Sequence, residues 1–177
     1  MLYTGKGDTG TTTAFGCDQQ RISKSSELPE ALGALDEVQS FIGFVKLRAT
    51  GNDRITTILH AVQETLFIIQ SEIAGADKHV EKGTVAEVEK IIQDIEKEIP
   101  KLTGFSIAGG TELSALLDVA RTLARRAERR VIGALDANTC HVTNETRAYL
   151  NRLSSLLFAL ARLANHLAGV AEENPQY

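Results

Sequence analysis

Residues 121–130 concentrate charge, because five of the ten are arginines and one carboxylate, Glu128, lies among them. Like charges four residues apart, such as Arg121 and Arg125, destabilise an isolated helix by roughly 0.2–0.5 kcal/mol per pair. A compensating anion is therefore expected, either a polyanionic ligand or the carboxylates of a partner, because both match the guanidinium fork. The structural alternatives are a solvated basic helix with Glu128 in internal pairs, and ion pairs between subunits.

A second group of polar residues occupies positions 4–13, which are dense in Gly and Thr. Gly allows a ligand to approach the backbone closely, and Thr hydroxyls and free N–H groups can surround an anion. Lys6 and Lys24 would add positive charge. The spacing differs from the Walker phosphate loop, which ends in Gly-Lys-Ser/Thr. Composition leaves two readings equally open, a phosphate-binding loop and a mobile N-terminal arm.

The remaining candidates are isolated residues. Phe105 is a large aromatic between glycines, and a loop anchor tucked into the core is its ordinary interpretation. His141 has no second ligand at metal-binding spacing, and Cys17 and Cys140 show no such spacing either. We therefore expect no metal ligands and a reduced, cytoplasmic compartment.

Composition narrows the class of protein. The chain has 177 residues, 43% hydrophobic and 24% charged, with a net charge of −4. These values predict one globular domain and argue against general nucleic-acid binding. The N-terminus lacks the pattern of a signal peptide, and no apolar run is long enough to span a membrane.

Apolar residues at steps of three and four predict five helices, over residues 27–50, 54–74, 84–98, 111–134 and 146–171. Short connections favour an all-α, antiparallel five-helix bundle covering residues 27–172, preceded by a non-helical arm over 1–26 and followed by a frayed tail over 172–177.

A helical wheel divides the charges of the fourth helix. At 100° per residue, Arg121, Arg125 and Glu128 share one flank of the apolar stripe. Arg129 lies beside Arg125 on the outer face, whereas Arg126 and Arg130 fall on the opposite flank.

Several blocks of sequence together resemble the human-type (propanediol-utilisation type) ATP:cob(I)alamin adenosyltransferases. They run in the family's order over nearly the whole chain: YTGKGDTGTT at 3–12 with Ser23-Lys24 after it, EALGALDE at 30–37, Leu66-Phe67, residues 105–110 with Arg121 and 125–129, and YLNRLS at 149–154. Each block alone is weak, but the ordered set is specific.

The resemblance implies a five-helix homotrimer with active sites between subunits. The enzyme would transfer the 5′-deoxyadenosyl group of ATP to the cobalt of cob(I)alamin and release triphosphate. Mg²⁺ would be held mainly by the ATP phosphates. A reductase and an adenosylcobalamin-dependent enzyme would be further partners. Because cobalt itself attacks, no protein nucleophile or general base is required.

The resemblance also assigns roles to individual residues. Phe105, at the lower face of the corrin, and Arg125 would be catalytic, and Asp36 would pair with Arg121 across the subunit interface. The residues that would bind ATP are Thr4, Gly5, Lys6, Gly7, Thr12, Thr13, Lys24, Arg125, Arg126, Glu128, Arg129 and Asn151.

Four features depart from the family pattern. Asp118 stands where a His is common, Gln39 replaces a usual Asn, Ser155 replaces a usual Asp, and the segment 17–24 is longer than in many relatives. Two other functions stay open: a non-catalytic corrinoid- or nucleotide-binding bundle whose arginines form subunit ion pairs, and an ordinary ATP phosphotransferase.

Overall fold

The computed structural model describes residues 3–15, 20–102 and 104–176. Within these ranges the chain forms five α-helices and one short antiparallel ladder. The elements are β1 (Thr11–Thr12), β2 (Ile22–Ser23), α1 (Glu27–Arg48), α2 (Asp53–Ile73), α3 (Lys82–Glu98), α4 (Glu112–Asp136) and α5 (Asn144–Leu167). The prediction of a five-helix, mainly helical fold is confirmed.

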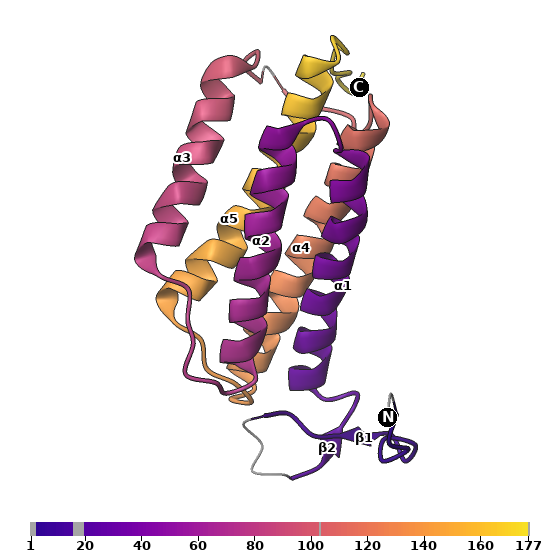
Figure 1. Cartoon of the computed structure of the whole chain (residues 1–177), viewed down its shortest axis with the longest axis vertical. Coiled ribbons are helices and arrows are strands. Elements are labelled where there is room, and N and C mark those ends of the chain that lie inside the picture. The colour runs from indigo at the N-terminus through magenta and orange to yellow at the C-terminus, as the bar shows by residue number, and fades with distance from the viewer. Residues whose placement is uncertain (1–2, 16–19, 103, 177) are drawn as a thin grey trace.

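Successive helices run up and down along the long axis of the molecule (Figure 1). α1 packs against α2 and α4, and α5 packs against α4 and α3. Neighbours α1 and α4 are antiparallel, as are α4 and α5, whereas α3 and α5 run in the same direction (Figure 1). α4 is thus the element that joins α1 to α5, and its charged residues lie between these two neighbours.

Complementary side-chain sizes explain how α4 fits between its neighbours. α4 contributes small buried residues, Ala120, Ala124 and Ala127, whereas α1 and α5 contribute buried Leu, Ile and Val. Small side chains shorten the distance between packed helix axes. This close packing fixes the angular position of the arginines that alternate with the alanines on α4.

The helix starts follow from local capping. Thr111 accepts a hydrogen bond from the Ser114 N–H at 3.1 Å and is therefore the N-cap of α4. α5 begins two residues before the predicted start, because Thr143 caps it through the Thr146 N–H. Glu72 of α2 strengthens this cap, since its carboxylate accepts from the Thr143 N–H at 2.6 Å and from the Thr146 hydroxyl.

The end of α5 corrects the sequence prediction. The helix stops at Leu167 rather than at residue 171, because Gly169 adopts a φ of 67° that favours glycine. The Gly169 N–H donates to His166 O and the Val170 N–H to Asn165 O, which is the Schellman pattern of helix termination. The following residues turn back over the end of the bundle.

The prediction of a frayed tail from residue 172 is also wrong for its first residues. Glu172 Oε1 accepts a 2.7 Å hydrogen bond from Nε of the buried Arg162. The Glu173 carbonyl accepts a 2.8 Å hydrogen bond from the Ile107 N–H. Two tertiary contacts therefore order this segment, which sequence composition did not reveal.

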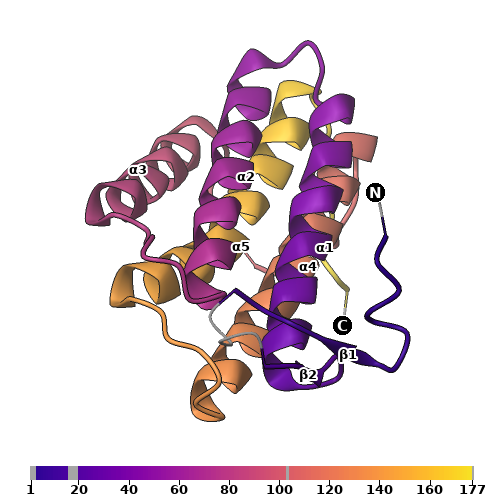
Figure 2. The same cartoon turned by 60° about the horizontal axis from the view of Figure 1, so that its bottom comes forward.

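The described residues before α1 lie at the lower end of α1 and include the short ladder of β1 and β2 (Figure 2). Thr11 pairs with Ser23 and Thr12 with Ile22. Arg21 connects these segments through hydrogen bonds. It donates to the Thr11 hydroxyl at 2.8 Å, to the Thr11 carbonyl at 2.7 Å and to the Lys6 carbonyl. Cys17 and part of the longer segment 17–24 lie outside the described residues.

None of the described helices combines the length and the apolarity that crossing a bilayer requires.

Candidate active site

The structure divides the arginines of α4 as the helical wheel predicts. Arg126 pairs with Glu37 and Arg130 with Glu30, at 3.6 Å in the second case, so both face α1. Arg121 and Arg125 face the opposite way, toward α5. Two of the five guanidinium groups are therefore already matched by carboxylates of a neighbouring helix.

Arg121 is held in place within its own helix. Its Nε lies 2.9 Å from Asp118 Oδ1, and its Cζ lies 5.9 Å from the centroid of the Phe158 ring. Asp118, where a His is common in the resembling family, is itself buried. The resemblance implied a partner for Arg121 in Asp36 of another subunit; within one chain the partner is Asp118, one turn away.

Arg125 and Arg129 differ from their neighbours. Within residues 3–15, 20–102 and 104–176, neither forms an ion pair with a carboxylate. Arg129 donates to the backbone carbonyl of Arg125, at 3.1 Å. Glu128, between them, instead accepts a 3.2 Å hydrogen bond from the Asn151 amide of α5. Two adjacent uncompensated cations thus stand beside a polar Glu128–Asn151 pair.

A pocket of about 450 Å³, here called the Phe105 pocket, opens beside these cations. It is lined by residues of α4, α5 and the loop before α4: Leu102, Gly104, Phe105, Ser106, Arg121, Arg125, Ser154, Ser155 and Phe158. The Phe105 side chain is 78% exposed. The interpretation of Phe105 as a core anchor is therefore wrong, since the ring stands at the rim of a pocket that also holds two arginines.

A second pocket, of about 640 Å³ and here called the Asp36 pocket, lies between α1 and α2. Asp36 and the aromatic rings of Phe15 and Phe67 line it, and Phe67 is 62% exposed. An exposed aromatic ring beside an exposed carboxylate is typical of a surface that contacts something else. Asp36 and Arg121 thus belong to different pockets of the chain.

The arm residues gather among themselves. Lys24 crosses over Gly7, because a Cβ added at Gly7 would lie 2.9 Å from Lys24 Nζ. Thr4 Oγ1 accepts from the Lys6 N–H at 3.4 Å. Lys24 and Gly7, predicted to bind one ligand, are therefore adjacent. The side-chain hydrogen bonds described for the arm run between arm residues, and none of them reaches α4.

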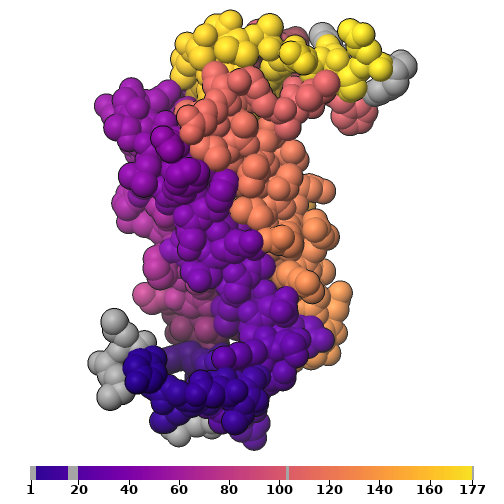
Figure 3. Space-filling view, turned by 90° about the vertical axis from the view of Figure 1, so that its right-hand side faces the viewer, coloured from indigo at the N-terminus to yellow at the C-terminus, as the bar shows by residue number. Residues whose placement is uncertain are grey.

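Figure 3 shows the face on which α1 and α4 lie side by side. The arm covers one end of this face, and the segment before α4 and the C-terminal residues cover the other (Figure 3). The predicted ATP-binding residues are therefore divided between the arm and α4–α5. Within residues 3–15, 20–102 and 104–176, no hydrogen bond joins these two groups in one chain.

Two buried residues outside the pockets have shifted pKa values. Burial raises the pKa of the Tyr149 phenol to about 12, against a smaller opposing effect of its hydrogen bond with Thr65. Burial, and then the charge of Glu72, raise the pKa of the Cys140 thiol. Neither residue lines the two pockets. Among the described residues, no three His, Cys, Asp or Glu side chains converge as metal ligands.

Sequence reasoning missed two residues around the Phe105 pocket. The Asp118–Arg121 contact has a local signal, because opposite charges three residues apart meet on one helix face. The contact of Arg121 with the Phe158 ring has no such signal, since Phe158 is on another helix.

Comparisons with known proteins agree with this geometry. A family model described as "Cobalamin adenosyltransferase" matches residues 2–164. The chain is 35% identical to a corrinoid adenosyltransferase of Bacillus subtilis over 97% of this chain and 90% of that protein. It is 38% identical to a corrinoid adenosyltransferase of Citrobacter freundii over 92% of this chain and 93% of that protein.

Solved structures of corrinoid adenosyltransferases are also similar to this chain. The chain superposes with a TM-score of 0.92 and 27% identity on a variant PduO-type ATP:corrinoid adenosyltransferase from Lactobacillus reuteri complexed with cobalamin and ATP, over 99% of this chain and 97% of the other. A second variant from that organism, complexed with ATP, superposes with a TM-score of 0.90 and 27% identity over 99% and 100% of the two chains.

Proposed function

The chain belongs to the cobalamin adenosyltransferase family, and from this premise we propose how its two pockets perform the reaction. The enzyme is an ATP:corrinoid adenosyltransferase that moves the 5′-deoxyadenosyl group of ATP to the cobalt of cob(I)alamin. The Co–C bond forms as the bond between C5′ and the triphosphate oxygen breaks. The cobalt supplies the electron pair, and triphosphate leaves with the pair of the broken bond.

The observation that carries the proposal is the position of Arg125. Its guanidinium lines the Phe105 pocket and has no carboxylate partner among the described residues. Negative charge grows on the triphosphate as it leaves, and a preorganised cation beside it stabilises the transition state more than the ground state. Arg129, one turn further along α4, would extend this positive surface to the rest of the triphosphate.

The residues around these arginines would complete the nucleotide site. Glu128 and Asn151, already hydrogen-bonded to each other, would contact ATP. The arm, residues 1–26, would close over the nucleotide and exclude water, and the bundle, residues 27–172, would hold the reacting groups. The arm residues that would bind ATP are Thr4, Gly5, Lys6, Gly7, Thr12, Thr13 and Lys24.

Arg126 was also expected to bind ATP. Its guanidinium pairs with Glu37 on the α1 side, so a contact of Arg126 with ATP stays a prediction.

Phe105 would act on the corrinoid. A cobalt that is to be reduced to cob(I) must lose its lower axial ligand, and a phenyl ring can take that place while offering no lone pair. The 78% exposure of Phe105 leaves its ring free to meet a large ligand in this way.

The two pockets would come together in a homotrimer. Asp36 of one subunit would meet Arg121 of the next, which Asp118 and Phe158 already hold at the rim of the Phe105 pocket. Ring closure by three copies makes every interface of this head-to-tail kind identical. Each of the three sites would then combine one Phe105 pocket with one Asp36 pocket.

Other components follow from the chemistry of the ligands. Mg²⁺ would be held mainly by the triphosphate oxygens, as is usual for this ion with nucleotides, and would share the neutralisation of the leaving group. A reductase that delivers one electron to cob(II)alamin and an enzyme that uses adenosylcobalamin would precede and follow the reaction.

One assay tests the proposed function. Chemically reduced cob(I)alamin is mixed with ATP, Mg²⁺ and the protein, and the visible spectrum and the phosphate products are followed together. We expect adenosylcobalamin and triphosphate in equal amounts. ADP as the product would indicate a phosphotransferase, and ATP binding without turnover would indicate a non-catalytic corrinoid- or nucleotide-binding bundle; either result would overturn the proposal.

A further inference from the structure

The segment that carries Phe105 is hydrogen-bonded to the C-terminal end of α5. This segment, here called the Phe105 loop, comprises residues 100–102 and 104–110 of the described chain. The Phe105 side chain is 78% exposed, so core packing of the ring does not fix its position. Whatever places the ring must act through the backbone of the loop.

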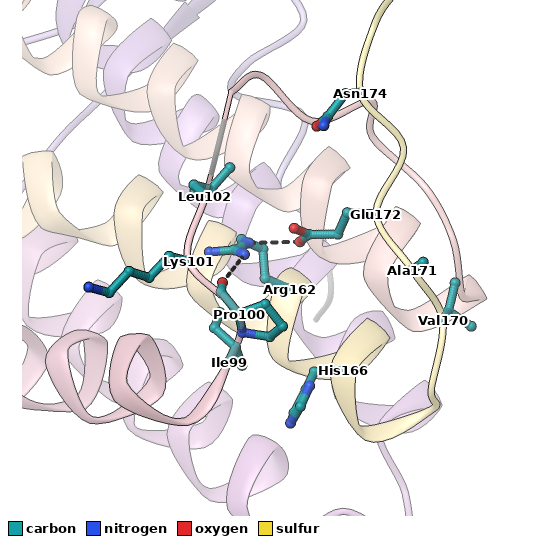
Figure 4. A pocket seen from close by; sticks show the side chains of 10 residues that line it. All are labelled: Ile99, Pro100, Lys101, Leu102, Arg162, His166, Val170, Ala171, Glu172 and Asn174. Carbon is teal, nitrogen blue, oxygen red and sulfur yellow. Dashed lines mark hydrogen bonds and ion pairs between the residues drawn. The ribbon is translucent and has the colours of Figure 1, made fainter.

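The first anchor holds the start of the loop. Arg162 of α5 is only 8% exposed, and its guanidinium donates to the Pro100 carbonyl and to Glu172 Oε1, both at 2.7 Å. Figure 4 shows Arg162 between these two partners, with the loop on one side and the C-terminal residues on the other. A buried guanidinium with a carboxylate and a carbonyl bound at the same time is a rigid connection.

The second anchor holds the end of the loop. Asn165, 5% exposed, donates from Nδ2 to the Gly109 carbonyl at 2.9 Å and accepts at Oδ1 from the Thr111 N–H at 2.9 Å. Gly110 approaches this amide so closely that an added Cβ would lie 2.5 Å from Asn165 Oδ1. The φ of Gly110 is 97°, a conformation that favours glycine, so this junction tolerates little displacement.

The third anchor comes from the C-terminal residues themselves. The Ile107 N–H, two residues after Phe105, donates to the Glu173 carbonyl at 2.8 Å. This contact depends on the turn at Gly169, which directs the chain back toward the loop, and on Glu172, which fixes the segment to Arg162. The C-terminal residues thus hold the loop near its middle, whereas α5 holds both of its ends.

We infer that Arg162, Asn165 and the segment 170–174 form a clamp that positions Phe105 over the pocket containing Arg121 and Arg125. These are positioning residues, because they lie outside that pocket and act through the loop backbone. The inference rests on the proposed role of Phe105 at the corrin. It makes removal of the lower axial ligand depend on the C-terminal segment, since a misplacement of about 1 Å can cost about 100-fold in rate.

The clamp itself is tested without any ligand. Glu172→Ala removes the carboxylate bound by Arg162, and hydrogen–deuterium exchange is then measured on the Ile107 amide and on residues 104–110. We expect faster exchange there, with protection in α4 unchanged. Glu172→Gln keeps an acceptor oxygen and should restore part of the protection. Unchanged exchange in Glu172→Ala would overturn the clamp. Glu173→Gln is the matched control, because only the backbone carbonyl of Glu173 takes part.

The consequence for the reaction is tested by comparing two substrates. With cob(II)alamin and a reductant, Glu172→Ala should be about tenfold slower than the parent protein, since Phe105 is no longer held. With pre-reduced cob(I)alamin the loss should stay within about twofold. Equal losses with both substrates would overturn the positioning role and indicate a merely structural one.

Phe105→Ala distinguishes a failure of the proposed role of Phe105 at the corrin from a failure of the clamp. If Phe105→Ala slows both substrates equally, the role of Phe105 at the corrin fails, while the exchange measurement still decides whether the clamp exists. If Phe105→Ala is selective and Glu172→Ala is not, the clamp fails as a positioning device and the proposed function stands.

Discussion

Arg126 and Arg130 each face a carboxylate of α1, and Arg121 faces Asp118 one turn earlier on its own helix. Arg125 and Arg129 have no such partner among the described residues. Charge without a partner near a partly enclosed surface favours the binding of an anion, because the interaction strengthens as water is excluded. Among the described residues, position on the helix, not residue type, therefore separates the arginines that have a carboxylate partner from those that do not.

Replacing Arg125 should have a large effect on the chemical step. In Arg125→Ala we expect the rate of adenosyl transfer from ATP to cob(I)alamin to fall by a factor that corresponds to roughly 3 kcal/mol, the range for losing one preorganised charge contact. Single-turnover rates at saturating ATP measure this. The matched control is Arg130→Ala, which removes the same side chain from the α1 side of α4. A rate for Arg125→Ala equal to that of the control would exclude Arg125 from the site.

Phe105 should matter most where the cobalt must be reduced. In Phe105→Ala the ring that would occupy the lower axial position is absent, so we expect turnover to fall much more with cob(II)alamin and a reductant than with pre-reduced cob(I)alamin. The ratio of the two rates measures the effect and cancels any loss common to both. Phe67→Ala is a suitable comparison, because it removes an exposed aromatic ring from the other pocket. A ratio in Phe105→Ala equal to that of the parent would reduce Phe105 to a packing residue.

At the scale of elements, the helices were predictable because their signals are local. The apolar steps along α1 and α2 and the Thr111 cap lie within a few residues of the structure they produce. The division of the arginines on α4 followed from the helix geometry alone. The same reasoning placed Phe105 outside the helices but could not tell a rim position from a core position.

The features that could not be predicted from the sequence depend on contacts between segments that are distant along the chain. Glu72 caps α5 from 71 residues away, and Arg162 binds Pro100 from 62 residues away. Neither pairing has a sequence pattern, because register between helices is set by core packing that a single sequence does not display. The misplaced end of α5 is different: Gly169 was a local stop signal, and the apolar residues after it led to an overlong helix.

The burial of Tyr149 on α5 predicts an alkaline loss of stability. Tyr149 is 1% exposed, and burial raises the pKa of its phenol to about 12. The pKa in the unfolded chain is about 10. Because the folded value is the higher one, the contribution of the neutral phenol is present below pH of about 10 and is lost as pH rises toward 12. A shift of this size corresponds to an order of magnitude of roughly 3 kcal/mol.

Denaturant unfolding between pH 8 and pH 12 measures this contribution. The free energy of unfolding of Tyr149→Phe should fall less steeply above pH 10 than that of the parent protein. Cys140 contributes with the same sign from lower pH, because its pKa is raised as well, but it is present in both proteins. Tyr3→Phe changes an exposed tyrosine and should leave the profile unaltered. Parallel profiles for Tyr149→Phe and the parent would contradict the prediction.

At the scale of the whole molecule, the two pockets lie on different helices, and this limits how one chain could use both for a single reaction. The Phe105 pocket lies on α4, α5 and the loop before α4, whereas the Asp36 pocket lies on α1 and α2. Both expose large aromatic rings, and each contains part of the predicted site. The simplest way to use both for one reaction is to bring the Asp36 pocket of one copy to the Phe105 pocket of another.

This arrangement predicts that two inactive variants restore activity when mixed. Asp36→Ala would disable the Asp36 side of every site, and Arg125→Ala would disable the Phe105 side. In trimers assembled at random from equal amounts of the two, a site is intact when the Arg125→Ala subunit supplies Asp36 and the Asp36→Ala subunit supplies Arg125. In a closed ring with identical head-to-tail interfaces, this holds for about one site in four.

Co-expression with two different affinity tags, followed by purification on both, isolates the mixed assemblies for the adenosyl-transfer assay. Because trimers of a single variant are removed, a mixed trimer carries one intact site among its three, and we expect about one third of the parent activity. Each variant purified alone must first be shown to be folded, trimeric and nearly inactive. If Asp36 and Arg125 instead act within the same subunit, every site in the mixed trimers lacks one of them, and mixing restores nothing.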